Sequence, residues 1–260
     1  MKITVLCENT ASSPMFRAEH GLSLLIETQG RTVLFDTGQT DAFARNAVRC
    51  GADLSRVDLC VISHGHYDHG GGLGCFLSLN GKSPVYISRR AFEPHYSADG
   101  RYIGLDASVK AAKQIVFTDG NTRIDDGLEL LCLPEAEVPG AFGLTALKDG
   151  KRVPDDFAHE QSLLVTENGR RVLFGGCSHG GAVKMVGTFC PDVFIGGFHL
   201  SKLDVCGDGA ERLREFASAL LESSALYYTG HCTGSEQYSF LKNIMGNKLD
   251  KISTGQSFVL

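Results

Sequence analysis

The sequence predicts an α+β fold in which two β-sheets pack together with helices on the outside, in one domain over residues 1–260. Three observations predict it. Short apolar runs bounded by Gly, Asp, Asn and Pro recur along the chain, a hairpin pattern opens each half, and helical periodicity appears in few places. No linker or short repeat divides the chain, and 260 residues with 43% hydrophobic content can bury a full core.

The predicted strands are apolar runs rich in β-branched and aromatic residues, which favour strand over helix. They are Ile3–Leu6, Ser23–Thr28, Thr32–Asp36, Leu59–Ser63, Val85–Ser88, Ile115–Thr118, Leu128–Leu133, Ser162–Thr166, Arg171–Gly175, Val193–Gly196, Leu226–Thr229 and Ser257–Leu260. Two pairs have the pattern of hairpins. Ser23–Asp36 turns at TQGR, and Ser162–Gly175 turns at ENGR, where Asn168 and Gly169 suit positive φ.

Two segments have the periodicity of amphipathic helices. Asp208–Ser223 is the clearer one, and Gly207 with Asp208 supplies its expected N-cap. The second is Thr40–Cys50. The expected apolar faces are Leu213, Phe216, Ala217, Leu220 and Leu221 in the first helix, and Phe43, Ala44, Ala47 and Val48 in the second.

Composition excludes several classes of protein. Lys and Arg number 25 against 30 Asp and Glu, a net charge of −5, so no basic footprint indicates a nucleic-acid partner. No apolar run approaches the roughly 20 residues that span a bilayer, and the N-terminal MKITVLCENT is too short for a signal peptide. The nine Cys residues are scattered without CxxC spacing, as in a reduced protein, and we expect a cytoplasmic location without a membrane partner.

The strongest chemical signal is SHGHYDHGGG at residues 63–72, directly after an apolar strand. His64 and His66 are two residues apart and can aim at one point, while Asp68 and His69 can aim at a second point nearby. Neutral imidazoles and a carboxylate suit Zn²⁺ or Fe²⁺. The surrounding glycines allow the tight backbone that brings these side chains together. The pattern therefore predicts a metal site at a sheet edge.

With this motif the chain resembles the metallo-β-lactamase fold superfamily of metal-dependent hydrolases, over nearly all of its length. The other matching segments are FDTG at 35–38, RVLFGGC at 171–177 and GHC at 230–232. The resemblance implies an αββα four-layer sandwich with a binuclear site at one edge of the sheets. HEQSL (159–163), GCSHG (176–180), GGFHL (196–200) and HCTG (231–234) resemble the branch named for 7,8-dihydropterin-6-methyl-4-(β-D-ribofuranosyl)aminobenzene-5′-phosphate synthase.

The resemblance also implies metal ligands. The first metal needs a third His beside His64 and His66, and there are two candidates. His159 lies 18 residues before Cys177, a spacing like that in zinc β-lactamases, whereas His179 lies in GCSHG. We favour His179 and keep His159 as the alternative.

The second metal would take Asp68, His69 and His231. Cys177 stands where many relatives have a bridging Asp. As a thiolate it would bind the second metal, and as a thiol it would only pack. We expect two divalent ions, Zn first, with Fe and Mn as alternatives.

Other polar residues have competing interpretations. Asp36 either accepts hydrogen bonds from a ligand His or the motif loop, or only forms a turn. His199 either contacts substrate, donates a proton, or is a core His. His20 and His95 lack supporting context and are expected at the surface. The polar segment Phe92–Lys113 either forms a lid that meets an anionic substrate or is a solvated insertion; the cations in or near it are Arg89, Arg90, Arg101, Lys110 and Lys113.

Together these features predict a hydrolase whose metal-bound hydroxide attacks a small anionic or phosphorylated metabolite, a small-molecule partner. Asp68 would orient the nucleophile and shuttle a proton, and His199 is the second catalytic candidate. The alternatives are a transferase or synthase of the methanopterin-precursor type and a non-hydrolytic protein, either an iron redox enzyme or a metal-binding module.

Overall fold

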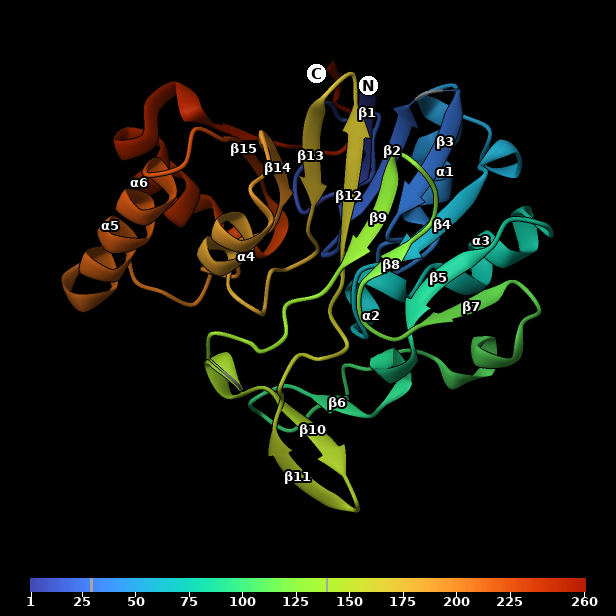
Figure 1. The fold of residues 1–260 in the computed structure, drawn as a ribbon, viewed down its shortest axis with the longest axis horizontal. Coiled ribbons are helices and arrows are strands. Elements are labelled where there is room, and N and C mark those ends of the chain that lie inside the picture. Colours follow the sequence, from blue (N-terminus) through green and yellow to red (C-terminus); the bar gives the residue numbers. More distant parts are fainter. Residues whose placement is uncertain (29, 139) are drawn as a thin grey trace.

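Two seven-stranded sheets lie face to face in the computed structural model, which describes residues 1–28, 30–138 and 140–260 (Figure 1). In order across the first sheet, the strands are β17 (Ser257–Val259), β1 (Lys2–Cys7), β2 (Ser23–Thr28), β3 (Arg31–Phe35), β4 (Leu59–Ile62), β5 (Val85–Ser88) and β7 (Ile115–Thr118). In the second they are β16 (Leu249–Lys251), β15 (Leu226–Thr229), β14 (Val193–Gly196), β13 (Arg170–Phe174), β12 (Ser162–Glu167), β9 (Leu128–Leu131) and β8 (Thr122–Arg123).

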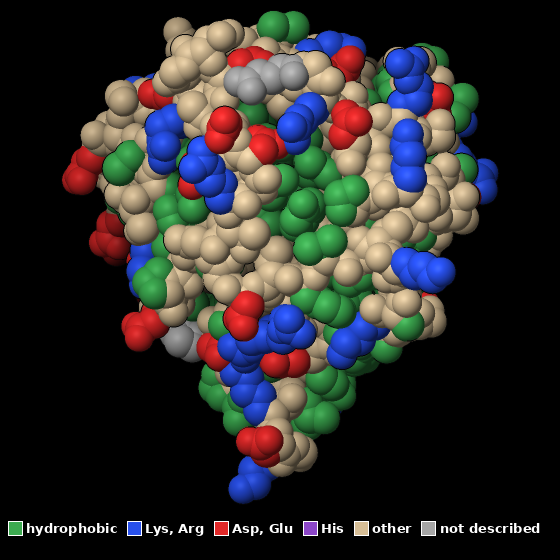
Figure 2. All heavy atoms as spheres, turned by 45° about the vertical axis from the view of Figure 1, so that its right-hand side comes forward, with side chains coloured by type: hydrophobic (Ala, Val, Ile, Leu, Met, Phe, Trp, Pro, Cys, Tyr) green, Lys and Arg blue, Asp and Glu red, His purple; other side chains and the backbone are tan. Residues whose placement is uncertain are grey.

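A small third sheet lies apart from these two. It contains β6 (His95–Tyr96), β10 (Thr145–Lys148) and β11 (Lys151–Pro154). The β10–β11 hairpin projects at the lower end of the molecule in Figure 1. Figure 2 shows the molecule narrowing towards this end, with cationic and acidic side chains side by side along it.

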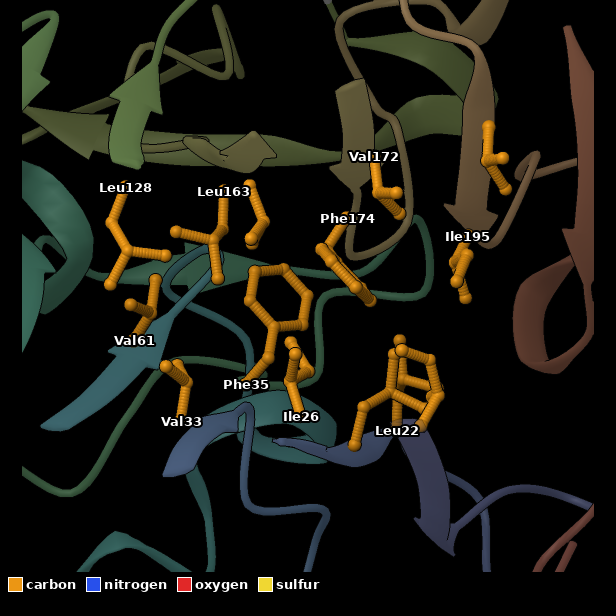
Figure 3. Close-up of a cluster of buried hydrophobic side chains, with 14 of the residues drawn as sticks. Leu22, Ile26, Val33, Phe35, Val61, Leu128, Leu163, Val172, Phe174 and Ile195 are labelled. Carbon is orange, nitrogen blue, oxygen red and sulfur yellow. The ribbon is translucent and has the colours of Figure 1, made fainter. Parts of the chain in front are cut away.

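The main core fills the space between the two large sheets. Because side chains alternate across a strand, one face of each sheet can be wholly apolar. Val33 and Phe35 of β3 point towards Leu163 of β12 and Phe174 of β13, and all four are fully buried (Figure 3). The Phe35 and Phe174 ring centroids are 6.1 Å apart. This interleaving fixes the two sheets against each other and so fixes the relative position of their edges.

Helices cover the outer face of each sheet through separate apolar clusters. On the first sheet these are α1 (Ala42–Arg49) and α3 (Leu73–Leu79); on the second they are α4 (Ala182–Phe189), α5 (Gly207–Leu221) and α6 (Ser235–Met245). The short helix α2 (Tyr67–Gly70) contributes no residue to these clusters and carries Asp68 and His69 of the motif. The result is the αββα order that the resemblance implied. No helix of the described chain has both the length and the apolar character required to cross a membrane.

Every predicted strand is present, and most of their ends agree within one residue. Both hairpins are antiparallel pairs, β2–β3 and β12–β13, although Gln29 of the TQGR turn lies outside the described residues. Both predicted helices are present as α1 and α5. Two details were wrong: α5 begins at Gly207 after Cys206, which makes no side-chain cap bond, and Val48 is 76% exposed because the inner face of α1 is completed by Asn46 instead.

Candidate metal centre

The candidate site lies at the carboxyl ends of parallel strands. Strands β3 and β4 are parallel, as are β13, β14 and β15, so the loops that follow them meet at one edge of the sandwich. Each of these loops carries a polar candidate; in chain order they are Asp36, the 63–69 motif, Cys177 with His179, His199 and His231. All nine histidines of the chain lie in or beside this region.

The first donor group consists of His64, His66 and His179. One ring nitrogen from each lies within 4.8 Å of the others, and all three side chains are buried. His64 Nε2 and His66 Nδ1 are 3.1 Å apart. Neither ring nitrogen of His179 has a hydrogen-bond partner among the described residues. Burial lowers the pKa of all three imidazoles well below the usual value, which keeps them neutral and able to bind a cation.

The second donor group consists of Asp68, His69, Cys177 and His231, and it too is buried. His69 Nε2 lies 3.1 Å from His231 Nε2 and 3.2 Å from Cys177 Sγ. Asp68 Oδ2 lies 3.2 Å from His231 Nε2. Nitrogen ligands at tetrahedral positions about 2.1 Å from Zn²⁺ would be about 3.4 Å apart, so this spacing suits one small cation.

Charges at the second donor group are balanced locally. Burial alone would raise the pKa of Asp68, but His69, His20 and His231 hold it well below its usual value. Burial alone would lower the pKa of His69, but the carboxylates of Asp36 and Asp68 raise it to about 9. The Cys177 thiol has a pKa well above its usual value, chiefly because it is buried. Without a cation the group therefore balances a carboxylate against an imidazolium.

Asp36 joins two loops of the first sheet, the one after β3 and the motif loop after β4. It is fully buried, and its carboxylate accepts hydrogen bonds from the Ser63 backbone N–H (2.7 Å) and hydroxyl (2.8 Å). Its Oδ2 is also 2.7 Å from His69 Nδ1. Asp36 therefore contacts both the motif loop and a candidate ligand. Its φ of 59° is a left-handed conformation that Asp tolerates better than most residues.

Glu8 and Asn9 support His231 and were missed from the sequence. Glu8 accepts the His231 backbone N–H at 2.6 Å, and Asn9 Oδ1 lies 2.9 Å from His231 Nδ1. A contact on Nδ1 orients the ring so that Nε2 faces the other donors. The sequence did contain a signal for these two residues, because both directly follow the first apolar strand, just as the 63–69 motif directly follows β4.

A third donor group consists of His66, His95, Asp155 and His159, so it shares His66 with the first donor group. His95 was expected at the surface, and this was wrong: it is fully buried, with Nδ1 2.7 Å from Asp155 Oδ2. Pairing of β6 with β10 carries His95 inward, a long-range contact without a local sequence signal. His159 lies here rather than in the first donor group, with Nε2 3.4 Å from Asp155 Oδ2. Burial opposes ionisation of Asp155, but His159 and His95 lower its pKa.

A cleft of about 440 Å³ opens over the donor groups. His20 is exposed, as expected, yet its Nε2 lies 3.2 Å from Asp68 Oδ2 at the cleft wall. His199 also lines the cleft, with its ring centroid 4.2 Å from that of His179, and burial lowers its pKa to about 4. Among the described residues, the charged side chains that line the cleft are two cations, Arg101 and Lys202, and two carboxylates, Asp68 and Asp99.

Of the cations in and near Phe92–Lys113, only Arg101 lines the cleft among the described residues. Arg90 instead pairs with Glu93 and Asp156. Arg89 and Lys110 lie over Phe rings. The segment therefore contributes one cation to the cleft, while Arg89, Arg90 and Lys110 make contacts outside it.

Comparison with known proteins agrees with this geometry. The family model of the metallo-beta-lactamase superfamily matches residues 17–186. An uncharacterized protein of Methanocaldococcus jannaschii is 30% identical over 96% of this chain and 98% of its own length. The 7,8-dihydropterin-6-methyl-4-(beta-D-ribofuranosyl)-aminobenzene-5'-phosphate synthase of the same organism is 28% identical over 98% of this chain and 95% of its own. A crystal structure described as a metal-dependent hydrolase of the beta-lactamase superfamily is 30% identical, with a TM-score of 0.86 over 100% of this chain and 99% of that one.

Proposed function

Because the chain belongs to the metallo-β-lactamase superfamily, we propose that it is a hydrolase that holds two divalent cations and cleaves a small anionic or phosphorylated substrate. The observation that carries the proposal is the pair of buried donor groups side by side on the floor of one cleft. Buried polar atoms without partners are costly, and His66 Nε2 and both nitrogens of His179 are in that state. A donor set with these properties fits cations.

For the first cation we assign the first donor group, with His179 rather than His159 as its third member. The Gly65 backbone N–H donates to His159 Nδ1 at 2.9 Å. A neutral imidazole that accepts at Nδ1 carries its proton on Nε2, so no nitrogen of this ring has a free lone pair. His159 Nε2 lies 3.4 Å from Asp155 Oδ2 and makes no hydrogen bond with any described residue, so the Gly65 contact is what sets this ring apart. Both His179 nitrogens lack such competing contacts.

For the second cation we assign Asp68, His69 and His231, with Cys177 as the fourth donor. A mixture of imidazole, carboxylate and thiolate favours Zn²⁺, while Fe²⁺ and Mn²⁺ remain alternatives that the first donor group also accepts. Binding would require His69 and Cys177 to lose their protons. The Asp36 carboxylate would then keep the His69 proton on Nδ1 and direct Nε2 to the cation.

Divalent cations at these positions supply Lewis acidity and make water a nucleophile near neutral pH. The chain's own residues supply positioning and proton transfer. Asp68, on the cleft wall, can orient the attacking water and take its proton. His199, neutral because of its lowered pKa, can hydrogen-bond the leaving group. Arg101 and Lys202 can contact an anionic substrate from the cleft wall, while the bound cations would supply the net positive charge that attracts it, because Asp68 and Asp99 line the same cleft.

The test combines metal content with turnover. Zinc-loaded protein is assayed with bis(p-nitrophenyl) phosphate and p-nitrophenyl phosphate, next to His66→Ala and the exposed control variant Glu222→Ala. We expect wild type and Glu222→Ala to hold two zinc ions and hydrolyse at least one ester, and His66→Ala to lose at least 100-fold in rate. Equal rates for wild type and His66→Ala would contradict the proposal.

The similarity to the synthase over nearly the whole of both chains favours a second candidate, a transferase that makes the compound in that enzyme's name. The same donor groups would then bind a phosphorylated substrate without directing water to it. The assay is formation of that product by metal-loaded protein from the pterin diphosphate and the ribofuranosylaminobenzene phosphate. Absence of product from fully loaded protein would remove this candidate.

A further inference from the structure

A second cavity adjoins the cleft at His199. We infer that this cavity, here called the annex, binds an aromatic part of the substrate while the anionic group lies over the donor groups; the inference rests on the proposed function. The annex measures about 310 Å³ and shares Phe142, His179 and His199 with the cleft. A substrate that passes over His199 can therefore occupy both cavities at once.

The walls of the annex are apolar and rich in aromatic rings. Phe198, Leu200 and Leu203 form its buried floor, and Phe216 is half-buried beside them. At the mouth, Val138 is 58% exposed. A ring bound here would remove apolar surface from water on both partners, which stabilises binding. A volume of about 310 Å³ lies at the small end of ligand cavities and suits one or two fused rings.

Among the described residues that line the annex, two have polar side-chain atoms without a partner, His179 and Ser178. Ser178 lines the cavity and is 3% exposed, and its hydroxyl makes no hydrogen bond with any described residue. Its backbone has a φ of 58°, a left-handed conformation that is unusual for Ser. Strained residues of this kind cluster at functional sites, which is consistent with a ligand-binding role for this wall of the annex.

The wall between cleft and annex is built from two residues in the same strained conformation. Phe142 (φ 56°) and His199 (φ 53°) pack edge to face, with ring centroids 5.1 Å apart. The surrounding structure must stabilise both, since residues other than glycine rarely adopt this conformation. His179 is held in place in turn, because its ring stacks on the ring of Phe157, with the centroids 4.7 Å apart and an interplanar angle of 10°. These contacts leave a rigid aromatic edge between the two cavities.

Charge is divided unevenly between the two cavities. Arg101 and Lys202 line the cleft together with Asp68 and Asp99, so the positive charge of the cleft would come from the cations held by the donor groups. The annex has one cation, Arg212, which is exposed, and Glu137 lines the same cavity with the opposite charge. The anionic end of a substrate is therefore stabilised over the donor groups, and an uncharged ring is stabilised in the annex. The substrate class that fits is an aryl ester of a small acid, such as an aryl phosphate.

The test measures binding of phosphonates, whose C–P bond resists hydrolysis, to zinc-loaded protein by calorimetry. The probes are methylphosphonate, phenylphosphonate and 1-naphthylphosphonate, with neutral 1-naphthalenemethanol as a fourth. Ala141→Trp fills the annex from its rim, and Ala111→Trp makes the same change at an exposed site outside both cavities. Phe216→Ala, which removes one wall, serves as a second variant; melting curves and zinc content are recorded for all.

We expect 1-naphthylphosphonate to bind wild type and Ala111→Trp at least tenfold more tightly than methylphosphonate. In Ala141→Trp this preference should fall below threefold, with methylphosphonate affinity unchanged within twofold, and in Phe216→Ala it should fall at least threefold. Equal affinity of wild type for methyl- and naphthylphosphonate would overturn the annex and leave the proposed function intact. A different result would refute the proposed function, and with it the substrate role of the annex. In that result no phosphonate binds wild type, whereas naphthalenemethanol still binds and Ala141→Trp weakens its binding.

Discussion

Asp36→Asn separates the electrostatic role of Asp36 from its role in the fold. Asn tolerates the left-handed φ of 59° as well as Asp does, so the turn after β3 should persist. The amide oxygen can still accept the Ser63 N–H. The amide NH₂, however, replaces the oxygen that faces His69 Nδ1 at 2.7 Å. His69 must then accept at Nδ1 and carry its proton on Nε2, the atom that faces Cys177.

The expected magnitude follows from that one contact. A hydrogen bond to a charged group contributes about 1.5–3 kcal/mol, and each 1.4 kcal/mol is tenfold in affinity. Removing a carboxylate that orients a metal-binding His lowers metal affinity by about 10–100-fold in other proteins, which agrees. We therefore expect affinity for the second cation to fall by about 10–100-fold. Affinity at the first donor group should change by less than about threefold, since Ser63 still contacts His64 Nδ1.

The assay is a competition titration of metal-free protein with Zn²⁺ and a chromophoric chelator, which resolves the two sites. The matched control is Asp58→Asn, because Asp58 also accepts a backbone N–H, from Thr32 at 2.8 Å, but lies outside the site. Asp58→Asn should bind both ions as wild type does. Unchanged affinity for the second ion in Asp36→Asn would refute the reasoning.

Three further outcomes are expected. His95→Phe should lower the free energy of unfolding by about 1.5–3 kcal/mol in urea titrations, because Asp155 loses a buried partner; a change below about 0.5 kcal/mol would contradict this. His199→Asn should lessen the pH dependence of metal-free stability by up to about 1.4 kcal/mol per pH unit between pH 4 and about 6.5. There the unfolded state binds a proton that folded His199 does not, so stability rises with pH; an unchanged slope in urea melts would count against the lowered pKa. Cys177→Ser should abolish the cobalt–thiolate absorption of Co²⁺-substituted protein, and a persistent band would exclude Cys177 as a ligand.

Much of the fold follows from local sequence. Strands such as Val85–Ser88 and Val193–Gly196 have the predicted bounds because they are short, apolar and fully or largely buried. Strand β11 (Lys151–Pro154) was not predicted, since its residues are exposed or half-buried and it lacks apolar alternation. Its existence depends on pairing with β10, which no short window of sequence reveals.

The same distinction applies to the site. The 63–69 motif is contiguous, so its donors could be recognised directly. His95 reaches the site through β6–β10 pairing, and Asp155 lies far from it in sequence, so neither had a local signal. His159 and His179 could not be separated from sequence, because only the Gly65 contact distinguishes their ring nitrogens.

The most direct test of the central claim is a crystal of the zinc-loaded protein measured at the zinc absorption edge. The account predicts two anomalous peaks, one among His64, His66 and His179 and one among the four residues of the second donor group. Absence of both peaks, or a zinc ion held by the third group in place of the first, would contradict it.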